Sequence, residues 1–568
     1  MKKGAAAFLF MVSVFCTVAF AGVSGAKANQ ADSVWLNGKI YTVDGDFSVV
    51  SAMAVGGGRI LFAGSDEGVR EYIGKGSEVV DLNGATVLPG LNDAHLHYLN
   101  LGMSKLRIGA HWKSKEEILA LVREAVAKAR PGEWIQGRGW NQMVWSPPIF
   151  PTREDLDAIA PDVPVVLIRT CGHAAWVNTK ALRMAGVGRD TKDPVGGEFI
   201  RDKNGEPTGV MTDQAMKFVT KLIPPFTEEQ YRDALMAAQA ELFSLGVTSA
   251  SDAGTESGII DLMKKMYEEG KLKVRLNVMA RVASDVQPAD MAGEAKKIFS
   301  RGVQTGLFDH RLQIRSYKVI SDGSLGARSA WMLAEYSDRP GHVGNGIFSD
   351  DQLYALVLEG YKAGFQMCVH AIGDAANRQV LDVYERVLSD GKNRDHRFRV
   401  EHAQILTEDD IPRFVKLGVI PSMQTVHATS DMNMAEDRVG PDRIRYAYAW
   451  RKLLDTGVVI PNGTDAPVEA VQPWQNLHAA VTRTDARFDP IGGWFPEERM
   501  TREEALRSYT VWPAYGSFEE NGKGSLERGK LADFIVIDRD FMKCPVTEIK
   551  DIKVLKTVVG GEVVYATE

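Results

Sequence analysis

Both ends of the chain contain short apolar stretches that alternate with polar residues and are separated by Gly, Asn and Asp. This pattern is typical of β-strands joined by tight turns. It occurs in "SVWLNGKIYTVD", "SAMAVGGGRILFAGS" and "SEVVDLNGATVLPG" near the N-terminus, and in "GSLERGKLADFIVID" and "IKVLKTVVGGEVVYA" near the C-terminus. Each end is too short to form a stable sheet alone. We therefore predict that 29–85 and 516–568 pair into one small β-sandwich domain.

The middle of the chain, 86–515, has apolar runs that alternate with helix-like stretches such as "EEQYRDALMAAQAELFSLG". Eight strand-like runs occur at 86–97, 246–254, 273–282, 312–323, 365–374, 398–406, 418–428 and 457–468. Eight strands with intervening helices predict an α/β fold of the (β/α)8 (TIM) barrel type. The interval 104–240 is too long for one crossover, so we predict an inserted subdomain after the first barrel strand.

The first 28 residues differ from the rest of the chain. Lys2 and Lys3 precede an apolar run that ends at Ala21, and A-x-A sequences end at Ala21 and Ala28. This order is that of a secretory signal peptide, which predicts an exported protein, periplasmic or secreted. An uncleaved membrane anchor is the alternative, because the apolar run is long for a signal peptide.

Composition excludes several classes of protein. Hydrophobic residues make up 45% of the chain and charged residues 25%, as in ordinary folded proteins. The net charge is −7 and no dense Lys/Arg stretch occurs, so nucleic acid is not an expected partner. The four cysteines are widely spaced and form no CxxC pair, which argues against a disulfide scaffold and a thiolate zinc site.

Potential metal ligands recur where the strand-like runs end. The chain has 11 histidines, and four of them fall at these positions. The full set is His95, His97, Lys318, His370, His402 and Asp465. Singly, each has an ordinary explanation, such as a hydrogen-bonded core histidine, a turn aspartate or a surface lysine. Because the carboxyl ends of barrel strands meet on one face, their recurrence predicts a shared metal site.

The segments that carry these residues resemble the ordered motifs of the metal-dependent amidohydrolase superfamily. The matching segments are "PGLNDAHLH", "YKVISDGSLGARSA", "VHAIGDAAN", "RVEHAQIL" and "NGTDAPVEA". The closest resemblance is to the branch that includes the N-substituted formamide deformylases, and it runs from about Asp32 to the C-terminus. Five motifs in order indicate membership of the superfamily but leave the substrate open.

The resemblance implies a site for two divalent metal ions, with zinc favoured. His95, His97 and Asp465 would bind one ion, and His370 and His402 the other. Lys318 matches the position that is carboxylated by carbon dioxide and bridges both ions. An ammonium group has no lone pair to donate, whereas a carbamate is an anionic oxygen ligand. With Lys318 unmodified, a single ion is the alternative.

The implied chemistry is hydrolysis. Bound metal ions lower the pKa of water to roughly 7 and polarise a substrate carbonyl. Asp465 would accept the proton of the attacking water and deliver it to the leaving nitrogen, as a general base and then a general acid.

Weaker candidates lie around this set. His173, Trp140 and Asn141 in the inserted region are candidate substrate-binding residues, with loop structure and packing as the alternatives. Asp322 would contact substrate or brace Lys318. His427, at the end of the seventh run, is a further pocket-lining candidate.

We therefore interpret the chain as a metal-dependent hydrolase of a C–N bond in a small molecule, with a linear amide such as an N-acyl or N-formyl amine favoured. A deaminase, cyclic amidase or decarboxylase could use the same metal ligands. A noncatalytic metal- or ligand-binding protein is the other alternative, although binding alone needs no proton acceptor such as Asp465. A homo-oligomer is compatible with the sequence, and no membrane partner is expected after signal cleavage.

Overall fold

A computed structural model describes residues 30–110, 113–169, 173–194, 196–389 and 395–567. The predicted signal peptide, 1–28, lies outside these residues. Within them, no helix combines the length and the apolar character needed to cross a membrane.

Seven parallel strands form the centre of the molecule and confirm the barrel prediction. Their order in the sheet is their order in the sequence, so each of these strands pairs with the next one along the chain. They are β8 (Leu91–Leu96), β15 (Val247–Thr255), β16 (Arg275–Ala280), β18 (Leu312–Ile320), β19 (Gln366–Ala371), β20 (Arg399–His402) and β21 (Ile420–Ser422). A short strand, β17 (Gln304–Gly306), pairs antiparallel with β18.

The eighth predicted run closes the barrel without forming a regular strand. The N–H of Ala94 in β8 donates to the carbonyl of Asn462, and the N–H of Gly463 donates to the carbonyl of Met423, next to β21. Residue 463 must be small, because a Cβ there would lie 2.5 Å from the backbone nitrogen of His95. The segment therefore lies between the first and seventh strands and brings Asp465 beside the first two histidines.

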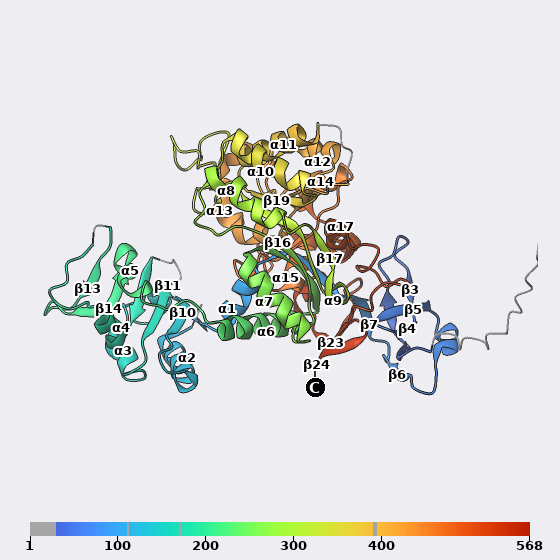
Figure 1. The fold of residues 1–568 in the computed structure, drawn as a ribbon, viewed down its shortest axis with the longest axis horizontal. Coiled ribbons are helices and arrows are strands. Elements are labelled where there is room, and N and C mark those ends of the chain that lie inside the picture. The colour runs from blue at the N-terminus through green and yellow to red at the C-terminus, as the bar shows by residue number, and fades with distance from the viewer. Residues whose placement is uncertain (1–29, 111–112, 170–172, 195, 390–394, 568) are drawn as a thin grey trace, which may run out of the picture.

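Helices cover the outside of the barrel between its strands (Figure 1). The predicted helix before the second strand is α6 (Glu228–Ser244), which begins with a capping box of Thr227 and Gln230 and buries one face that includes Leu235 and Leu242. The others are α7 (Ser257–Glu268), α8 (Pro288–Phe299), α10 (Asp350–Lys362), α11 (Asp374–Leu388), α12 (Ile411–Leu417), α14 (Trp450–Asp455) and α15 (Pro473–Thr482).

Two sheets built from the chain ends form the small β-sandwich. One, in the order β5-β4-β1-β6, is entirely N-terminal, and the other, in the order β24-β23-β22-β7-β2-β3, combines both ends. The strands are β1 (Ser33–Leu36), β2 (Lys39–Tyr41), β3 (Val49–Val50), β4 (Ala52–Gly56), β5 (Arg59–Gly64), β6 (Glu78–Asp81), β7 (Thr86–Pro89), β22 (Phe534–Ile537), β23 (Val554–Val559) and β24 (Glu562–Ala566). The rings of Trp35 and Phe534 meet edge to face, 4.9 Å apart, in the core between the sheets.

The first strand-like run, 86–97, is divided between two sheets. Its first half is β7, which pairs with β22 in the sandwich, and its second half is β8 of the barrel. The break comes at Pro89 and Gly90, where the proline has no N–H to donate to a sheet and Gly90 donates to the carbonyl of Asp533. One apolar run therefore connects the sandwich directly to the first metal-ligand strand.

The inserted region forms a sheet of its own between α1 (Tyr98–Lys105) and α6. Its strand order is β13-β14-β12-β11-β10-β9. The strands are β9 (Ile108–Gly109), β10 (Ile135–Trp140), β11 (Val165–Arg169), β12 (Ala174–Val177), β13 (Phe199–Arg201) and β14 (Pro207–Thr212). Figure 1 shows this unit on the left of the barrel and the β-sandwich on the right.

Candidate metal centre

The predicted metal ligands meet at the carboxyl ends of the barrel strands. His95 is on β8 and His97 directly follows it, so both side chains point the same way along an extended backbone. Lys318 is on β18, His370 on β19 and His402 at the end of β20. Asp465 comes from the irregular closing segment.

Asp465 lies within ligand distance of both histidines of the first strand. Its Oδ1 is 3.2 Å from His97 Nε2 and 3.6 Å from His95 Nε2. The Nζ atom of Lys318 lies 3.4 Å from His95 Nε2. His95, His97 and Asp465 therefore form one group whose donor atoms could surround an ion.

His402 joins the remaining histidines to this group. Its ring centroid is 4.8 Å from that of His95 and 4.5 Å from that of His370. His402 Nδ1 lies 2.7 Å from Gln424 Oε1, which leaves Nε2 as its ligand atom. His402 and Asp465 both have left-handed backbones, with φ of 75° and 58°. Such strain in residues other than glycine is typical of functional sites.

A second possible ligand group contains His427, near the start of α13 (Thr425–Arg443). It consists of His402, His427 and Asp465, and His427 Nε2 lies 3.7 Å from Asp465 Oδ2. Asp465 thus faces one histidine pair with Oδ1 and His427 with Oδ2. The sequence analysis named His427 only as a pocket-lining candidate, although its place at the end of a strand-like run was the same indication that identified the others.

A buried ion pair holds the first histidine in position. Glu401 Oε2 lies 2.5 Å from His95 Nδ1, and Arg399 binds the same carboxylate. None of these three side chains has measurable exposure. A carboxylate on the outer nitrogen of a ligating histidine fixes the ring and directs its other nitrogen to the metal. The sequence analysis missed Glu401, although two charged residues in the short apolar strand "RVEH" were an available indication.

Asp93 braces the closing segment against β8. Its carboxylate accepts hydrogen bonds from the backbone N–H groups of His95 and Thr464 and from the Thr464 hydroxyl. Burial raises the pKa of Asp93 to about 7. This contact sets the spacing between the residues that precede Asp465 and the strand that carries His95.

Burial and neighbouring charges favour the neutral form of His95 and His402. Burial, with the Lys318 ammonium, lowers the pKa of His95 to about 4, and burial lowers the pKa of His402 well below its usual value. Burial would raise the pKa of Asp465, but its contacts with His97, His95 and His402 hold it well below the usual range. Neutral imidazoles and an ionised carboxylate are the forms that bind metal.

Several donor atoms at this end of the barrel are buried and unpaired. Among the described residues, His370 Nε2, His427 Nε2 and Asp465 Oδ1 have no hydrogen-bond partner. An unpaired buried polar atom costs about 1–3 kcal/mol, so native structures rarely keep one without a function. Nitrogen and oxygen donors in this number fit divalent metal ions such as zinc.

The candidate substrate-binding residues of the insertion do not join this cluster. Trp140 is fully buried and donates from Nε1 to the carbonyl of Leu167, so it packs the core of the insertion. Asn141 Oδ1 accepts a hydrogen bond from Arg169. His173 is largely exposed, and its Nδ1 lies 2.9 Å from Asp213 Oδ1. All of them lie in the unit that Figure 1 shows beside the barrel.

Asp322 braces the loop that follows Lys318. Its carboxylate accepts hydrogen bonds from the backbone N–H groups of Trp331, Ile372 and Gly373. Oδ1 also lies 3.3 Å from His370 Nε2, and the side chain is not exposed. These contacts join Asp322 to the loop and to His370, so the two roles considered from the sequence, substrate contact and bracing of Lys318, stay predictions.

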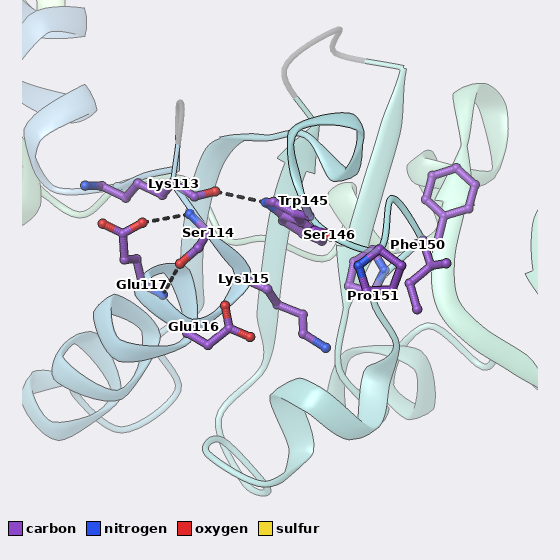
Figure 2. A pocket seen from close by; sticks show the side chains of 11 residues that line it. Lys113, Ser114, Lys115, Glu116, Glu117, Trp145, Ser146, Phe150 and Pro151 are labelled. Carbon is purple, nitrogen blue, oxygen red and sulfur yellow. Dashed lines mark hydrogen bonds between the residues drawn. The ribbon is translucent and has the colours of Figure 1, made fainter.

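The insertion has a surface cavity of its own, of about 560 Å³. Figure 2 shows it between the start of α2 (Lys115–Lys128) and the loop that runs from Trp145 to Pro151. Its charged lining residues are Lys113, Lys115, Glu116 and Glu117, and none of the metal-centre residues lines it. This cavity is therefore separate from the metal centre.

Comparison with known proteins identifies the family. A model described as "Amidohydrolase family" matches residues 78–565. The chain is 34% identical to the Protein LONG AFTER FAR-RED 3 of Arabidopsis thaliana, covering 94% of this chain and 92% of that protein. It is 31% identical to the putative amidohydrolase YtcJ of Bacillus subtilis, covering 94% and 99%. It is 27% identical to the N-substituted formamide deformylase of Arthrobacter pascens, covering 94% and 98%.

A solved structure supports the same assignment. An uncharacterized metal-dependent hydrolase from Pyrococcus furiosus superposes with a TM-score of 0.72 at 31% identity, covering 90% of this chain and 100% of that one. The chain belongs to the amidohydrolase family. It is a metal-dependent hydrolase of that family, similar to YtcJ and to the Arabidopsis protein.

Proposed function

We propose that this protein hydrolyses a C–N bond, and that its substrate is a linear amide of the N-acyl or N-formyl amine type. The observation that carries the proposal is the position of Asp465, which touches the first histidine pair with one oxygen and faces His427 with the other. The name of the Arthrobacter relative, a deformylase of N-substituted formamides, supports a linear amide.

The residues that would hold two ions are His95, His97, His370, His402, Lys318 and Asp465. Bound divalent ions would supply an activated water and polarise the carbonyl of the substrate. Lys318 is buried, and burial lowers the pKa of its amine. A neutral amine is the form that adds carbon dioxide, so this environment suits the carboxylated lysine that we propose as a bridging ligand.

Asp465 performs the proton transfers in this proposal. Its carboxylate takes a proton from the attacking water and passes it to the amide nitrogen as the C–N bond breaks, because an amine leaves only when it is protonated. His95 remains in position through Glu401, and His427 presents an unpaired Nε2 to the same pocket. Its N–H would donate to an oxygen of the substrate.

The test is hydrolysis by the purified, zinc-supplied protein of N-formyl amines, N-acyl amines and cyclic amides. Product amine from the linear amides supports the proposal. Turnover of cyclic amides alone, or release of ammonia from a substrate amino group, would contradict it. Metal analysis of the same sample should give about two ions per chain, as a bridged site requires.

We also propose that the protein is exported, on the evidence of the N-terminal sequence alone. Cleavage after Ala21 or Ala28 would be seen as a new N-terminus when the protein is expressed with its leader and recovered from the periplasm. A protein that keeps Met1 and stays in the membrane fraction would support the anchor instead.

A further inference from the structure

Arg281 is a half-buried arginine that lies next to the metal centre. It directly follows β16, and the parallel register pairs Ala280 with Tyr317 of β18. The next position along each strand is then Arg281 on one and Lys318 on the other. Arg281 is fixed there because its backbone N–H donates to the carbonyl of Thr255.

The side chain of Arg281 belongs to the inner face of the barrel. Two residues earlier, Met279 packs with Ala253 and Cys368. Cys368 is on β19, which is not a neighbour of β16 in the sheet, so these residues can meet only across the barrel interior. Side chains alternate along a strand, and Arg281 therefore continues the inner face at the mouth of the barrel.

A glycine makes room for Arg281 beside Lys318. At Gly254, an added Cβ would lie 2.9 Å from Arg281 Cδ and 3.4 Å from Lys318 Cγ. The glycine has a φ of +117°, which other residues rarely adopt. The stems of Arg281 and Lys318 thus lie side by side against the backbone of Gly254.

The charge of Arg281 is not neutralised by the part of the protein that the structure describes. Its Nε donates to the carbonyl of Val282, and it forms no ion pair with a described carboxylate. Two fully buried arginines of the barrel behave differently: Arg275 pairs with Asp533 and Arg399 pairs with Glu401. A guanidinium group binds carboxylates through two parallel hydrogen bonds, so the free one at the mouth is suited to an anionic ligand.

We infer that Arg281 binds a carboxylate of the substrate, and that the substrate is therefore an amide that carries a carboxylate, such as an N-acyl amino acid. The inference rests on the proposed amide hydrolysis, whose substrate class it narrows. A bidentate charge-assisted contact is worth about 100-fold in kcat/KM between a substrate that makes it and one that cannot.

The experiment compares matched amides with the zinc-loaded protein. N-formylphenylalanine and N-formyl-2-phenylethylamine differ only in the carboxylate on the amine side. N-phenethylsuccinamic acid and N-phenethylpropionamide differ in the same way on the acyl side. The readout is the ratio of kcat/KM within each pair. We expect a ratio of about 100 for one pair, falling to about 1 in R281M. The ratio should fall by less in R281K, because lysine keeps the positive charge but lacks the two parallel donors of the guanidinium group.

The matched control is R315M. Arg315 is on β18 and its guanidinium lies 3.6 Å from the ring of Phe518, toward the opposite end of the barrel. This variant loses the same charge, and its ratio should remain that of the unmodified protein. Equal losses of kcat/KM on both members of a pair in R281M would overturn the inference. A loss of bound metal would also overturn it, because Arg281 would then act by positioning Lys318.

A binding measurement separates this inference from the proposed function. Titration of D465N and of D465N/R281M with N-formylphenylalanine and N-phenethylsuccinamic acid requires no turnover. Binding of either ligand that weakens by about 100-fold in the double variant supports the carboxylate contact even if no amide is hydrolysed. Equal affinity in the two variants, or no binding by D465N, overturns the inference even if amides are hydrolysed.

Discussion

The two ends of the barrel differ in how far their polar groups are satisfied. At the amino ends of the strands, Arg275 forms a two-pronged ion pair with Asp533, and the side-chain amide of Gln366 donates to the carbonyls of Arg397 and Gly516. At the carboxyl ends, His370, His427 and Asp465 keep buried donor or acceptor atoms without a partner. These groups at the first end find their partners within the protein, whereas the proposed metal ligands at the second end keep atoms for a bound ligand.

This contrast separates residues that stabilise the fold from residues that act on a ligand, although both kinds are buried and charged. By burial and charge alone, Arg275 and Asp465 could not be assigned to different roles. What distinguishes them is whether the protein itself supplies every partner. Variants at the two ends should therefore give opposite results for stability and activity.

The largest effect is expected for D465N. The amide side chain keeps the shape but cannot accept the proton of water, so kcat should fall by about 10⁴-fold. Stability should change much less than activity, because the amide oxygen of asparagine can still accept from His97, whose Nε2 lies 3.2 Å from Oδ1 of Asp465. Steady-state kinetics and urea unfolding measure the two effects. Activity within tenfold of the unmodified protein would remove Asp465 from the mechanism.

D533N should show the reverse pattern at the other end of the barrel. The substitution leaves the Arg275 guanidinium, which is 1% exposed, without its counter-charge. The free energy of unfolding should fall by about 3 kcal/mol, because breaking a buried pair leaves an uncompensated charge. In the protein that remains folded, kcat/KM should change by less than about threefold, since Asp533 touches no proposed ligand. A loss of activity without a loss of stability would contradict the division between the two ends.

E401Q should give a smaller effect, at the functional end. Glutamine keeps the volume but weakens the contact that orients His95, so metal affinity should fall by about 10- to 100-fold. Competition with a zinc chelator measures this affinity without reference to turnover. The expectation is that excess zinc restores most of the activity. Unchanged affinity would mean that Glu401 serves only to neutralise Arg399.

N141A should have the smallest effect. Asn141 lies in the insertion, where its side chain binds Arg169, and no described contact joins it to the metal centre. We expect kcat/KM to change by less than about threefold, as for a substitution far from the chemistry. A larger change, measured on the amide that the unmodified protein hydrolyses best, would show that the insertion reaches the substrate during turnover.

The sequence was sufficient for the parts of the site that depend on strand ends. His95, His97, His370 and His402 follow apolar runs, and the rule that barrel strands converge on one face brings them together without knowledge of helix packing. Asp465 was predicted in the same way, although its segment is not a regular strand. Its position depends on Asp93 and Gly463, contacts that no local pattern reveals.

Other contacts could not be read from the sequence because they join residues that are distant along the chain. The pairing of Glu401 with His95 and the place of Arg281 beside Lys318 both depend on the register between parallel strands. The division of the 86–97 run has a local cause in Pro89 and Gly90, which a sequence pattern can reveal. That the two halves join different sheets depends on β22, the distant partner of β7. Trp140 was a candidate for substrate binding, yet the insertion packs it into its own core, and Asn141 binds Arg169.

The pairing of β7 with β22 has a consequence for how the molecule is made. The ribosome finishes Thr86–Pro89 long before it reaches Phe534–Ile537, so the sheet that adjoins the first ligand strand has to wait for almost the whole polypeptide. We expect a chain truncated before Phe534 to bind no zinc, and nascent molecules to remain open until release. Such a delay would suit the export that we propose, because a chain that is still open can cross a membrane before it folds.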